Sequence, residues 1–514
     1  MFWMNFLHIY QPPDQSEEIL EKVANESYRP LFRGFLDASK KNPRLKVNLN
    51  INGCLTELLA KKGYRDVIEN IRRLAEQGNL EFTESAKYHA LLPFLNQERI
   101  ISQIISNHQT NRRYFGSVYQ PECFFPPEMA YSQKVGRVIS KLGYKFILLD
   151  GISFNGQPDQ FPSDRLFKIN QTNLIPIFRE RRRSNAIQSG LVWTVKEFKD
   201  LISEDLYRNK YLCTAMDGET FGHHHIDLDK PLIKIVSTGQ PNQIFLSEVV
   251  KYFPVEKGTI EPVASTWAST QNDLEKGLQF YSWHDPQNKV HRLQWRLVRF
   301  LLRKVKQQKY LSSKQQDKVN CALASDQFFW ASGEPWWSIE NIEKGAWITL
   351  EAIKNLPRIT SREVKEAESI YRHILSIAFW WQRSGKIERQ IKKYQEAVKI
   401  PFKERTFEIG GEEIYQQVVE LMKKQMKEAA QRKNYERAIV WRDAIKKLEN
   451  KNDIYDLMHI VDLLRVDLPR EFKTIDPQLN ALFAKYKEKY QKIASGQPEA
   501  RGIKKRIKKQ QNRE

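Results

Sequence analysis

The chain has 514 residues, of which 41% are hydrophobic and 28% are charged, and its formal net charge at pH 7 is +21. This composition is ordinary for a soluble globular protein. The length exceeds what one hydrophobic core usually serves, so two or more domains are expected. The sequence holds no run of eighteen or more apolar residues, which argues against a membrane span.

The cysteines and the first residues indicate the compartment. Cys54, Cys123, Cys213 and Cys321 lie far apart and form no CxxC pair, which argues against a zinc ribbon or a disulfide framework. This usage fits a reducing environment. Residues 1–7 are apolar but lack the basic start of a signal peptide, so they are expected to form a buried strand. We therefore expect a cytoplasmic protein.

The first half of the chain alternates between two kinds of segment. Amphipathic helical stretches such as residues 64–74 separate several apolar runs that are typical of buried strands. These runs are residues 2–9, 47–51, 80–82, 146–149, 174–177 and 211–215. Strands that alternate with helices predict a parallel sheet, either open or closed into a barrel, and the pattern alone does not choose between the two.

From about residue 285 the sequence becomes helical. The predicted helices are residues 290–307, 339–356 and 363–400. Pro401 marks the expected end of the last helix, and the glycine pair 410–411 then punctuates the chain.

Two acidic residues carry the strongest chemical signal. Asp217 follows the strand-like residues 211–214 and opens the segment 217–225, which adds a second acid, two glycines and three histidines. Glu128 lies among the prolines and aromatics of residues 121–131, which would hold it rigidly. Two carboxylates at two strand ends, framed by aromatics, are the equipment for breaking a glycosidic bond. The alternative for each acid alone is a solvated loop charge.

Several short segments, taken in chain order, resemble the sequence regions of glycoside hydrolase family 57. These segments are residues 7–13, 78–93, 121–131 and 215–225, with residues 324–330 as a fifth, weaker one. The resemblance covers roughly residues 1–335 and the helices to about residue 400. It implies an α/β fold, with an incomplete seven-stranded (β/α) barrel beside a helical domain, and a retaining enzyme that acts on α-glucans.

The resemblance also implies roles for individual residues. Glu128 corresponds to the nucleophile and Asp217 to the acid/base, and in a retaining enzyme such carboxyl groups lie roughly 5–5.5 Å apart. The candidate substrate-binding residues are His8, Gln11, Glu81, His89, Glu219, His223, Trp267 and Asp326. His8 and Gln11 are expected to bind the sugar next to the cut. Trp267 stands in a polar Ser/Thr setting and is the tryptophan expected to stack on a sugar face.

The charges near these residues lead to two further expectations. Apolar packing by Phe221 or repulsion from neighbouring acids is expected to raise the pKa of Asp217. Arg179 and residues 181–183 are interpreted as a solvated face rather than as a lining of the cleft.

Other functions remain open at the level of sequence. Histidines near an aspartate also fit a metal-dependent polysaccharide deacetylase, but residues 223–225 are consecutive and cannot all aim at one ion, so neither a metal nor a cofactor is expected. A non-catalytic binding scaffold is a second alternative, against which the presence of both Glu128 and Asp217 argues. Gln327 follows Asp326 where better-known members usually carry an aromatic, so amylase, glucanotransferase and branching activities all remain open.

Residues 412–450 contain two charged amphipathic helices with a break near residues 433–434. They resemble the UVR motif, a small helical hairpin best known from bacterial excision-repair proteins, where it mediates protein contacts. The resemblance implies a protein-docking module without chemistry, and the alternative is a generic charged hairpin. The apolar seam between the helices is expected to contain Ile414, Val418, Leu421, Ala438, Trp441 and Ile445.

The expected domains are a barrel at residues 1–284, a helical domain at 285–409, a hairpin at 410–450, a helical extension at 451–500 and a basic tail at 501–514. The tail holds seven basic residues and one acid. Contact with nucleic acid is expected only through this tail, and the alternative is a disordered solubilising end. The other expected partners are the α-glucan and a protein at the hairpin, and no membrane partner is expected.

Overall fold

The computed structural model of the chain describes residues 1–190, 192–334, 336–391, 412–449 and 463–464. The chain forms two compact units, Met1–Ile391 and the residues from 392 onward. The predicted extension at 451–500 and the tail at 501–514 lie outside the described residues, apart from Leu463 and Leu464. None of the described helices is long and apolar enough to cross a membrane.

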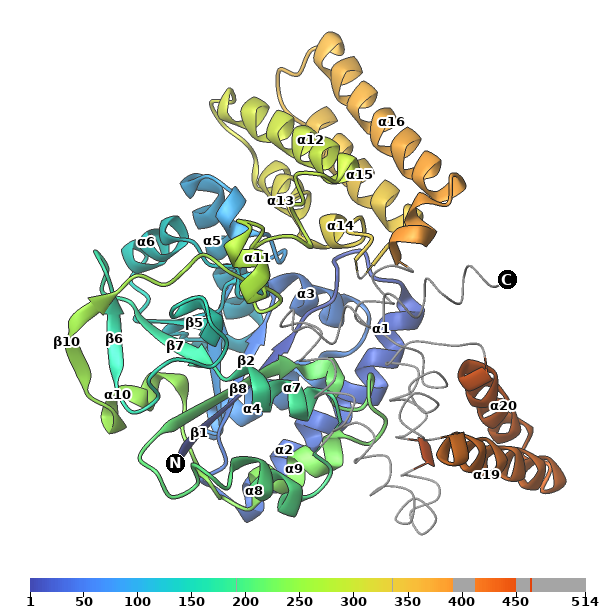
Figure 1. The fold of residues 1–514 in the computed structure, drawn as a ribbon. Helices are drawn as coiled ribbons and strands as arrows, with labels where there is room; N and C mark the ends of the chain where they lie inside the picture. Colours follow the sequence, from blue (N-terminus) through green and yellow to red (C-terminus); the bar gives the residue numbers. More distant parts are fainter. Residues whose placement is uncertain (191, 335, 392–411, 450–462, 465–514) are drawn as a thin grey trace. The chain divides into compact units, whose positions relative to one another are not determined.

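Seven parallel strands form a nearly closed barrel, which confirms the predicted fold (Figure 1). The strands are β1 (Phe2–Ile9), β2 (Val47–Ile51), β3 (Leu80–Glu84), β4 (Cys123–Phe124), β5 (Phe146–Asp150), β7 (Ile175–Arg179) and β8 (Tyr211–Asp217). Their order is β7-β5-β4-β3-β2-β1-β8, and each neighbouring pair is parallel. The short strand β9 (Asn242–Gln243) also pairs with the start of β1.

Contacts between β7 and β8 bring the two ends of this strand order together. The backbone N–H of Glu180 donates to the carbonyl oxygen of Cys213 at 2.9 Å. The Nε of Arg179 donates to the carbonyl oxygen of Ala215 at 2.8 Å. A backbone bond and a side chain therefore join the ends of the barrel.

The barrel strands are buried on both faces, because helices cover the outside. All residues of β2 and β5 are buried, including the polar Asn48, Asn50 and Asp150. Asn48 is satisfied inside the barrel, since its Nδ2 donates to Asn5 O at 3.3 Å and its Oδ1 accepts from Leu246 N at 2.8 Å. Burial on both faces explains why the sequence shows continuous apolar runs instead of alternation.

The helices that follow the strands surround the barrel (Figure 1). They are α1 (Glu17–Val23), α2 (Arg29–Lys41), α3 (Gly53–Lys61), α4 (Arg65–Glu76), α5 (Gln97–Phe115), α6 (Gln133–Lys141), α7 (Arg181–Gln188), α8 (Val195–Ile202), α9 (Asp229–Ser237), α10 (Val249–Tyr252) and α11 (Gln271–Glu275). A small parallel sheet pairs β6 (Leu166–Ile169) with β10 (Val255–Ile260). Local sequence sets the helix ends: at α5 the Asn96 side chain accepts from Arg99 N at 3.0 Å, and Gly116 ends the helix with φ 68°.

A helical region with its own hydrophobic cluster completes the first unit. Its helices are α12 (Lys289–Lys306), α13 (Ser313–Cys321), α14 (Asp326–Phe329), α15 (Ile339–Lys354) and α16 (Ser361–Arg383). The predicted helices at 290–307 and 339–356 are confirmed. The predicted helix at 363–400 is interrupted, because α16 ends at Arg383 and Gly385 turns the backbone with φ 65° before residues 386–391 become helical again. Residues 392–400 of this prediction lie outside the described residues.

The described part of the second unit is a helical hairpin of α19 (Glu412–Gln431) and α20 (Tyr435–Glu449). The predicted break between the helices is confirmed, and Lys433 occupies it with φ 57°. The buried residues of the hairpin are Tyr415, Val418, Val419, Met422, Trp441, Ala444, Ile445 and Leu448. Of the seam predicted from sequence, Val418, Trp441 and Ile445 are buried, Leu421 and Ala438 are partly buried, and the Ile414 side chain lies outside the description.

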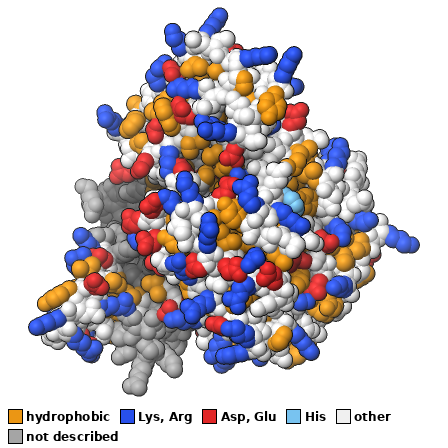
Figure 2. Space-filling model, turned by 180° about the vertical axis from the view of Figure 1, so that it is seen from behind, with side chains coloured by type: hydrophobic (Ala, Val, Ile, Leu, Met, Phe, Trp, Pro, Cys, Tyr) orange, Lys and Arg blue, Asp and Glu red, His pale blue; other side chains and the backbone are white. Residues whose placement is uncertain are grey.

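The surface charge is distributed. On the face drawn in Figure 2, Lys and Arg side chains are scattered widely, with Asp and Glu side chains among them. The net charge of +21 is therefore not gathered into a single basic patch on this face.

Candidate active site

The carboxyl ends of the barrel strands bring the two acids predicted from sequence to one rim. Asp217 is the last residue of β8, and it lies opposite His8 in the parallel register of β1 and β8. Glu128 lies just beyond β4, in the tight turn Pro127–Met129. Its backbone has φ 60°, a left-handed conformation that is uncommon for a residue other than glycine and that is frequent at functional sites.

An indole holds the Glu128 carboxylate. Trp267 Nε1 donates to Glu128 Oε2 at 2.8 Å, and Trp267 N donates to the Glu128 carbonyl oxygen at 3.1 Å. The other carboxylate oxygen, Oε1, is 3.7 Å from His89 Nδ1. The Glu128 side chain is 17% exposed, so it is largely enclosed but still reachable.

Three rings stack beside Glu128. The His89 ring stacks against Tyr10, with ring centroids 4.3 Å apart, and against His8, at 5.1 Å, and the His8 and Tyr10 centroids are 6.3 Å apart. The Trp267 ring meets His8 edge-on at 6.2 Å. Because His8 and Tyr10 are two positions apart, at the end of β1 and just beyond it, the chain presents both on one side.

Both histidines of this stack are neutral at physiological pH. Burial lowers the pKa of His8 to about 4, although the contact of its Nδ1 with Asn50 Oδ1 at 2.9 Å opposes the shift. Burial and the nearby His8 lower the pKa of His89 well below its usual value. His89 Nδ1 contacts Ser325 Oγ at 3.1 Å, whereas its buried Nε2 has no hydrogen-bond partner among the described residues.

Glu219 collects three donors on one oxygen. Gln11 Nε2 donates to Glu219 Oε1 at 3.3 Å, the Tyr10 backbone N–H donates at 3.2 Å, and the Tyr28 hydroxyl donates to the same atom. Burial, followed by the charge of Asp217, raises the pKa of Glu219 to about 7.

Asp326 reaches the rim from the helical region. The Tyr10 hydroxyl donates to Asp326 Oδ2 at 2.5 Å, and burial raises the pKa of Asp326 to about 6. An open pocket with about 300 Å³ of empty volume adjoins it, with Pro12, Asp14 and Trp330 in its lining. The neighbouring Gln327 is turned inward, because its Nε2 donates to Ala322 O at 2.9 Å.

Two of the predicted substrate-binding residues lie apart from this arrangement. Glu81 is the second residue of β3, toward the amino end of the strand, and its carboxylate accepts from Ser247 N at 3.1 Å. Its pKa is raised to about 7, chiefly by burial. His223 Nδ1 contacts Glu26 Oε2 at 2.6 Å, beside the helical turn Ala24–Tyr28.

Burial dominates the electrostatics of the acidic pair. It raises the pKa of Glu128 to about 8, with the Trp267 hydrogen bond acting against the shift and the charge of Asp217 adding to it. It raises the pKa of Asp217 to about 6, and the charge of Arg179 acts against this shift. The pair therefore carries one proton between about pH 6 and pH 8.

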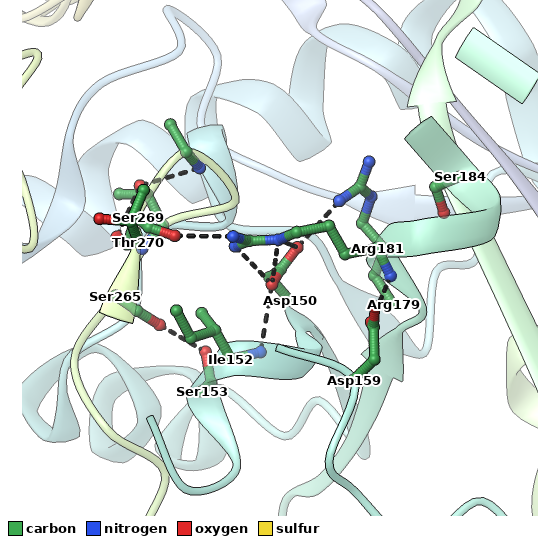
Figure 3. Close-up of polar contacts among 12 residues, drawn as sticks. Asp150, Ile152, Ser153, Asp159, Arg179, Arg181, Ser184, Ser265, Ser269 and Thr270 are labelled. Atoms are coloured by element: carbon green, nitrogen blue, oxygen red, sulfur yellow. Dashed lines mark hydrogen bonds and ion pairs between the residues drawn. The ribbon is translucent and has the colours of Figure 1, made fainter. Parts of the chain in front are cut away.

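Arg179 corrects one expectation. The interpretation of this residue as part of a solvated face is wrong, because its side chain is 4% exposed and pairs with the fully buried Asp150 at 2.9 Å. Arg181 pairs with the same carboxylate at 2.7 Å (Figure 3).

The sequence analysis did not identify Tyr10, Tyr28, Asp150 or Ser325. Tyr10 and Ser325 each adjoin a residue that it did identify. Asp150 carried a usable signal, since it is a charged residue that closes an otherwise apolar strand run.

Comparison with known proteins was made by sequence and by structure. The family model described as "Glycosyl hydrolase family 57" matches residues 3–257, and the one described as "UvrB/uvrC motif" matches residues 416–451. A putative alpha-amylase of Methanocaldococcus jannaschii is 24% identical over 287 residues, which are 51% of this chain and 58% of that protein. Alpha-amylase 1 of Dictyoglomus thermophilum is 24% identical over 148 residues, 29% of this chain and 21% of that protein. The chain thus spans less than two thirds of the length of either relative.

A solved structure shares the fold. The family 57 branching enzyme of Thermococcus kodakaraensis is similar with a TM-score of 0.56 and 15% identity, over 73% of this chain and 95% of that chain. A 4-alpha-glucanotransferase of Thermococcus litoralis gives a TM-score of 0.54 and 15% identity, over 70% and 59% of the two chains. The barrel at residues 3–257 is therefore a member of glycosyl hydrolase family 57, and the chain continues into a UvrB/UvrC motif.

Proposed function

We propose that this chain is a retaining glycoside hydrolase or transglycosylase that acts on α-glucans. The observation that carries the proposal is the pair of buried carboxyl groups at the barrel rim, Glu128 and Asp217, with an indole N–H directed at one of them. Membership of the barrel in family 57, and relatives named as amylases and as a glucanotransferase, support the substrate class.

In the proposed reaction Glu128 attacks the anomeric carbon while Asp217 donates a proton to the leaving glucan oxygen. Asp217 then takes a proton from water or from a hydroxyl of a second glucan, which displaces Glu128. The Trp267 hydrogen bond is made to Oε2 and favours the ionised carboxylate, which leaves Oε1 for the attack. Water as the second acceptor gives hydrolysis, and a glucan hydroxyl gives transfer or branching.

The proton must sit on Asp217 when the reaction begins, although the two pKa values favour Glu128 as its holder in the empty site. Whether the proton is on Glu128 or on Asp217, the pair holds one proton near neutral pH. Positive charge that develops at the anomeric carbon favours ionised Glu128, so the reacting sugar itself stabilises the proposed distribution.

The ring stack and the polar groups around it are proposed to bind the sugar next to the cut. His89 Nε2 has no partner among the described residues and is proposed to meet a sugar hydroxyl. His8, Gln11, Glu219, Trp267 and Asp326 are proposed to complete this subsite. We do not assign a sugar contact to Glu81 or His223, since they are engaged with Ser247 and Glu26.

Azide chemistry tests the function and the two roles together. Glu128→Ala and Asp217→Ala are given an activated α-maltosyl fluoride with sodium azide. Azide should replace the missing nucleophile in Glu128→Ala and give a β-glycosyl azide. In Asp217→Ala it should intercept the glycosyl-enzyme and give the α-anomer. If the two variants gave the opposite anomers, the two roles would be exchanged. If the unaltered protein did not turn over the fluoride, the proposal would be overturned.

Product analysis with maltooligosaccharides separates hydrolysis, transfer and branching. An N-acetylglucosamine oligosaccharide, assayed with and without EDTA, tests the deacetylase alternative, which needs a metal and predicts acetate release that EDTA abolishes. We also propose a protein-docking role for the UvrB/UvrC hairpin and a reducing, cytoplasmic setting, which the four free cysteines favour. Pulldown of partners on the isolated hairpin sequence and its Tyr435→Ala form tests the docking role.

A further inference from the structure

One buried carboxylate touches both halves of the candidate active site from behind. Asp150 ends β5 and is fully buried, and Arg179 and Arg181 approach it from the end of β7 and the start of α7 (Figure 3). These three residues are called the Asp150 cluster here. Asp150 also accepts from Ile152 N at 3.1 Å, which fixes the carboxylate to its own turn.

The first arm of the cluster leads to Asp217. Arg179 uses NH1 to reach Asp150 Oδ2 at 2.9 Å and Nε to reach the carbonyl oxygen of Ala215 at 2.8 Å. Ala215 lies two positions before Asp217 on β8. The arginine therefore holds the strand that carries Asp217, at the junction where β7 and β8 meet.

The second arm leads to Glu128. Arg181 donates to Asp150 through NH2 at 2.7 Å and to the carbonyl oxygen of Ser269 through NH1 at 2.7 Å. Ser269 lies two positions after Trp267, whose indole and backbone N–H groups both donate to Glu128. The arginine therefore holds the loop that orients the Glu128 carboxylate.

The charge of Asp150 is needed to keep both arginines in place. Two guanidinium groups share this one carboxylate, with side chains only 4% and 14% exposed. Without the negative charge they would repel each other in a place that water reaches poorly. The Trp267 loop keeps other ties, because Ser153 and Ser265 hydroxyls lie 2.6 Å apart and Tyr131 N donates to Ser265 O at 2.9 Å. Loss of the charge should therefore shift the loop without unfolding it.

We propose that Asp150 is a positioning residue, which fixes the spacing of the two candidate catalytic carboxyl groups through its two arginines. The inference rests on the proposed function. Spacing matters because a covalent retaining reaction needs the carboxyl groups roughly 5–5.5 Å apart, and small displacements of reacting groups are costly. Asp150 lies outside the reacting atoms and acts only through these two arms.

The test compares Asp150→Asn with the unaltered full chain on maltooligosaccharides. The expected result is a fall in kcat of about 10- to 100-fold with KM changed less than about threefold, since the sugar-binding groups do not touch the cluster. Thermal melting checks that the variant is folded. If Asp150→Asn does not fold, Arg181→Met replaces it, because this change removes the Arg181 bonds to Asp150 and to Ser269 and leaves the Arg179 arm in place.

The pH profile supplies a readout that a purely structural role would not move. The charged groups coupled to Asp217 are Arg179, Glu128 and Glu219. When residue 150 is neutral, the charge of Arg179 is no longer shared, so the pKa of Asp217 should fall below about 6. The alkaline limb of kcat/KM, which needs Asp217 protonated, should then move to lower pH.

A matched control and a double variant complete the test. Asp159→Asn removes a carboxylate that accepts from the backbone N–H groups of Arg181 and Arg182 but meets neither guanidinium arm, and it should leave kcat and the limb unchanged. When Trp267→Phe is already present, Asp150→Asn should lower kcat by a smaller factor than it does in the unaltered chain. If the unaltered chain is active and Asp150→Asn has the same kcat, the inference is overturned. It is also overturned if the fall in kcat equals the fraction of the variant that is unfolded. An inactive parent overturns the proposed function instead.

Discussion

The Nε1–H of Trp267 donates to Oε2 of Glu128 at 2.8 Å, across 139 positions of sequence. This bond acts against the rise in the pKa of Glu128 that burial causes. A residue that the sequence suggested as a platform for sugar therefore also tunes the carboxylate proposed to attack.

Trp267→Phe keeps a ring but removes this donor. The pKa of Glu128 should rise above about 8, since a hydrogen bond to the ionised form is lost. Because the nucleophile must be ionised, the acid limb of kcat/KM should move to higher pH, and kcat at neutral pH should fall on the order of 10- to 100-fold. Trp283→Phe is the control, because Trp283 Nε1 has no hydrogen-bond partner among the described residues. An unmoved limb in Trp267→Phe would separate the indole from the chemistry.

The stability of the protein should depend on Glu128 and on pH. Its pKa is raised from the ordinary value of 4.5 to about 8 in the folded chain, so the folded state binds the proton more tightly. The contribution is full below pH 4.5 and is lost as the pH rises through 8. Glu128→Gln has no proton to lose, and its advantage should grow across that range, to at most about 5 kcal/mol at 1.4 kcal/mol per pH unit. Urea unfolding at pH 5 and pH 8.5 measures it, and an equal difference at both pH values contradicts the argument.

Tyr10→Phe should separate binding from folding at Asp326. The change removes the hydroxyl that donates to Asp326 but keeps the ring on His89. We expect KM for maltooligosaccharides to rise several-fold and the free energy of unfolding to fall by about 1–2 kcal/mol. Tyr310→Phe, at an exposed position, is the control. A loss of stability with unchanged KM would make Asp326 a structural residue.

The hairpin should be separable from catalysis. Trp441 is 1% exposed in the seam of α19 and α20, so Trp441→Ala should cost about 3–5 kcal/mol, enough to unfold a two-helix unit. Turnover of glucan should survive, because the proposed catalytic groups lie on the barrel. Limited proteolysis should cut the variant within residues 412–449 but spare the Tyr435→Ala control, whose side chain is 64% exposed. Loss of turnover with unchanged proteolytic resistance would assign the hairpin a part in the active site.

The fold and the two acids could be predicted from sequence because both depend on local signals. Apolar runs predict six of the seven barrel strands, and Asp217 closely follows one of these runs. Glu128 was found from its proline and aromatic neighbours, because the two-residue strand β4 was not among the predicted runs. The end of β3 was harder to predict: the strand begins at Leu80, as expected, but continues to Glu84, which leaves Glu81 near its amino end and puts Glu84 at the rim end. One strand carries acids at both ends, and the pattern does not say which end matters.

Partners that come from distant segments could not be predicted. Asp150 gains its meaning from Arg179 and Arg181, and through them from Ala215 and Ser269. The solvated interpretation of Arg179 failed for the same reason, because its counter-charge lies 29 positions away on another strand. Gly385 stands in the predicted helical segment, but an isolated glycine in a helical pattern is often tolerated. The end of α16 was therefore not predicted.

The place of β1 in the barrel has a consequence for synthesis. Strand β1 pairs with β8, which is synthesised some 200 residues later, and Asp326 follows later still. At about 5–20 residues per second the nascent β1 waits at least about ten seconds for this neighbour, with an unpaired edge exposed. A chain truncated before Tyr211 lacks both that neighbour and Asp217. Truncated products would therefore carry an exposed strand edge and be prone to self-association.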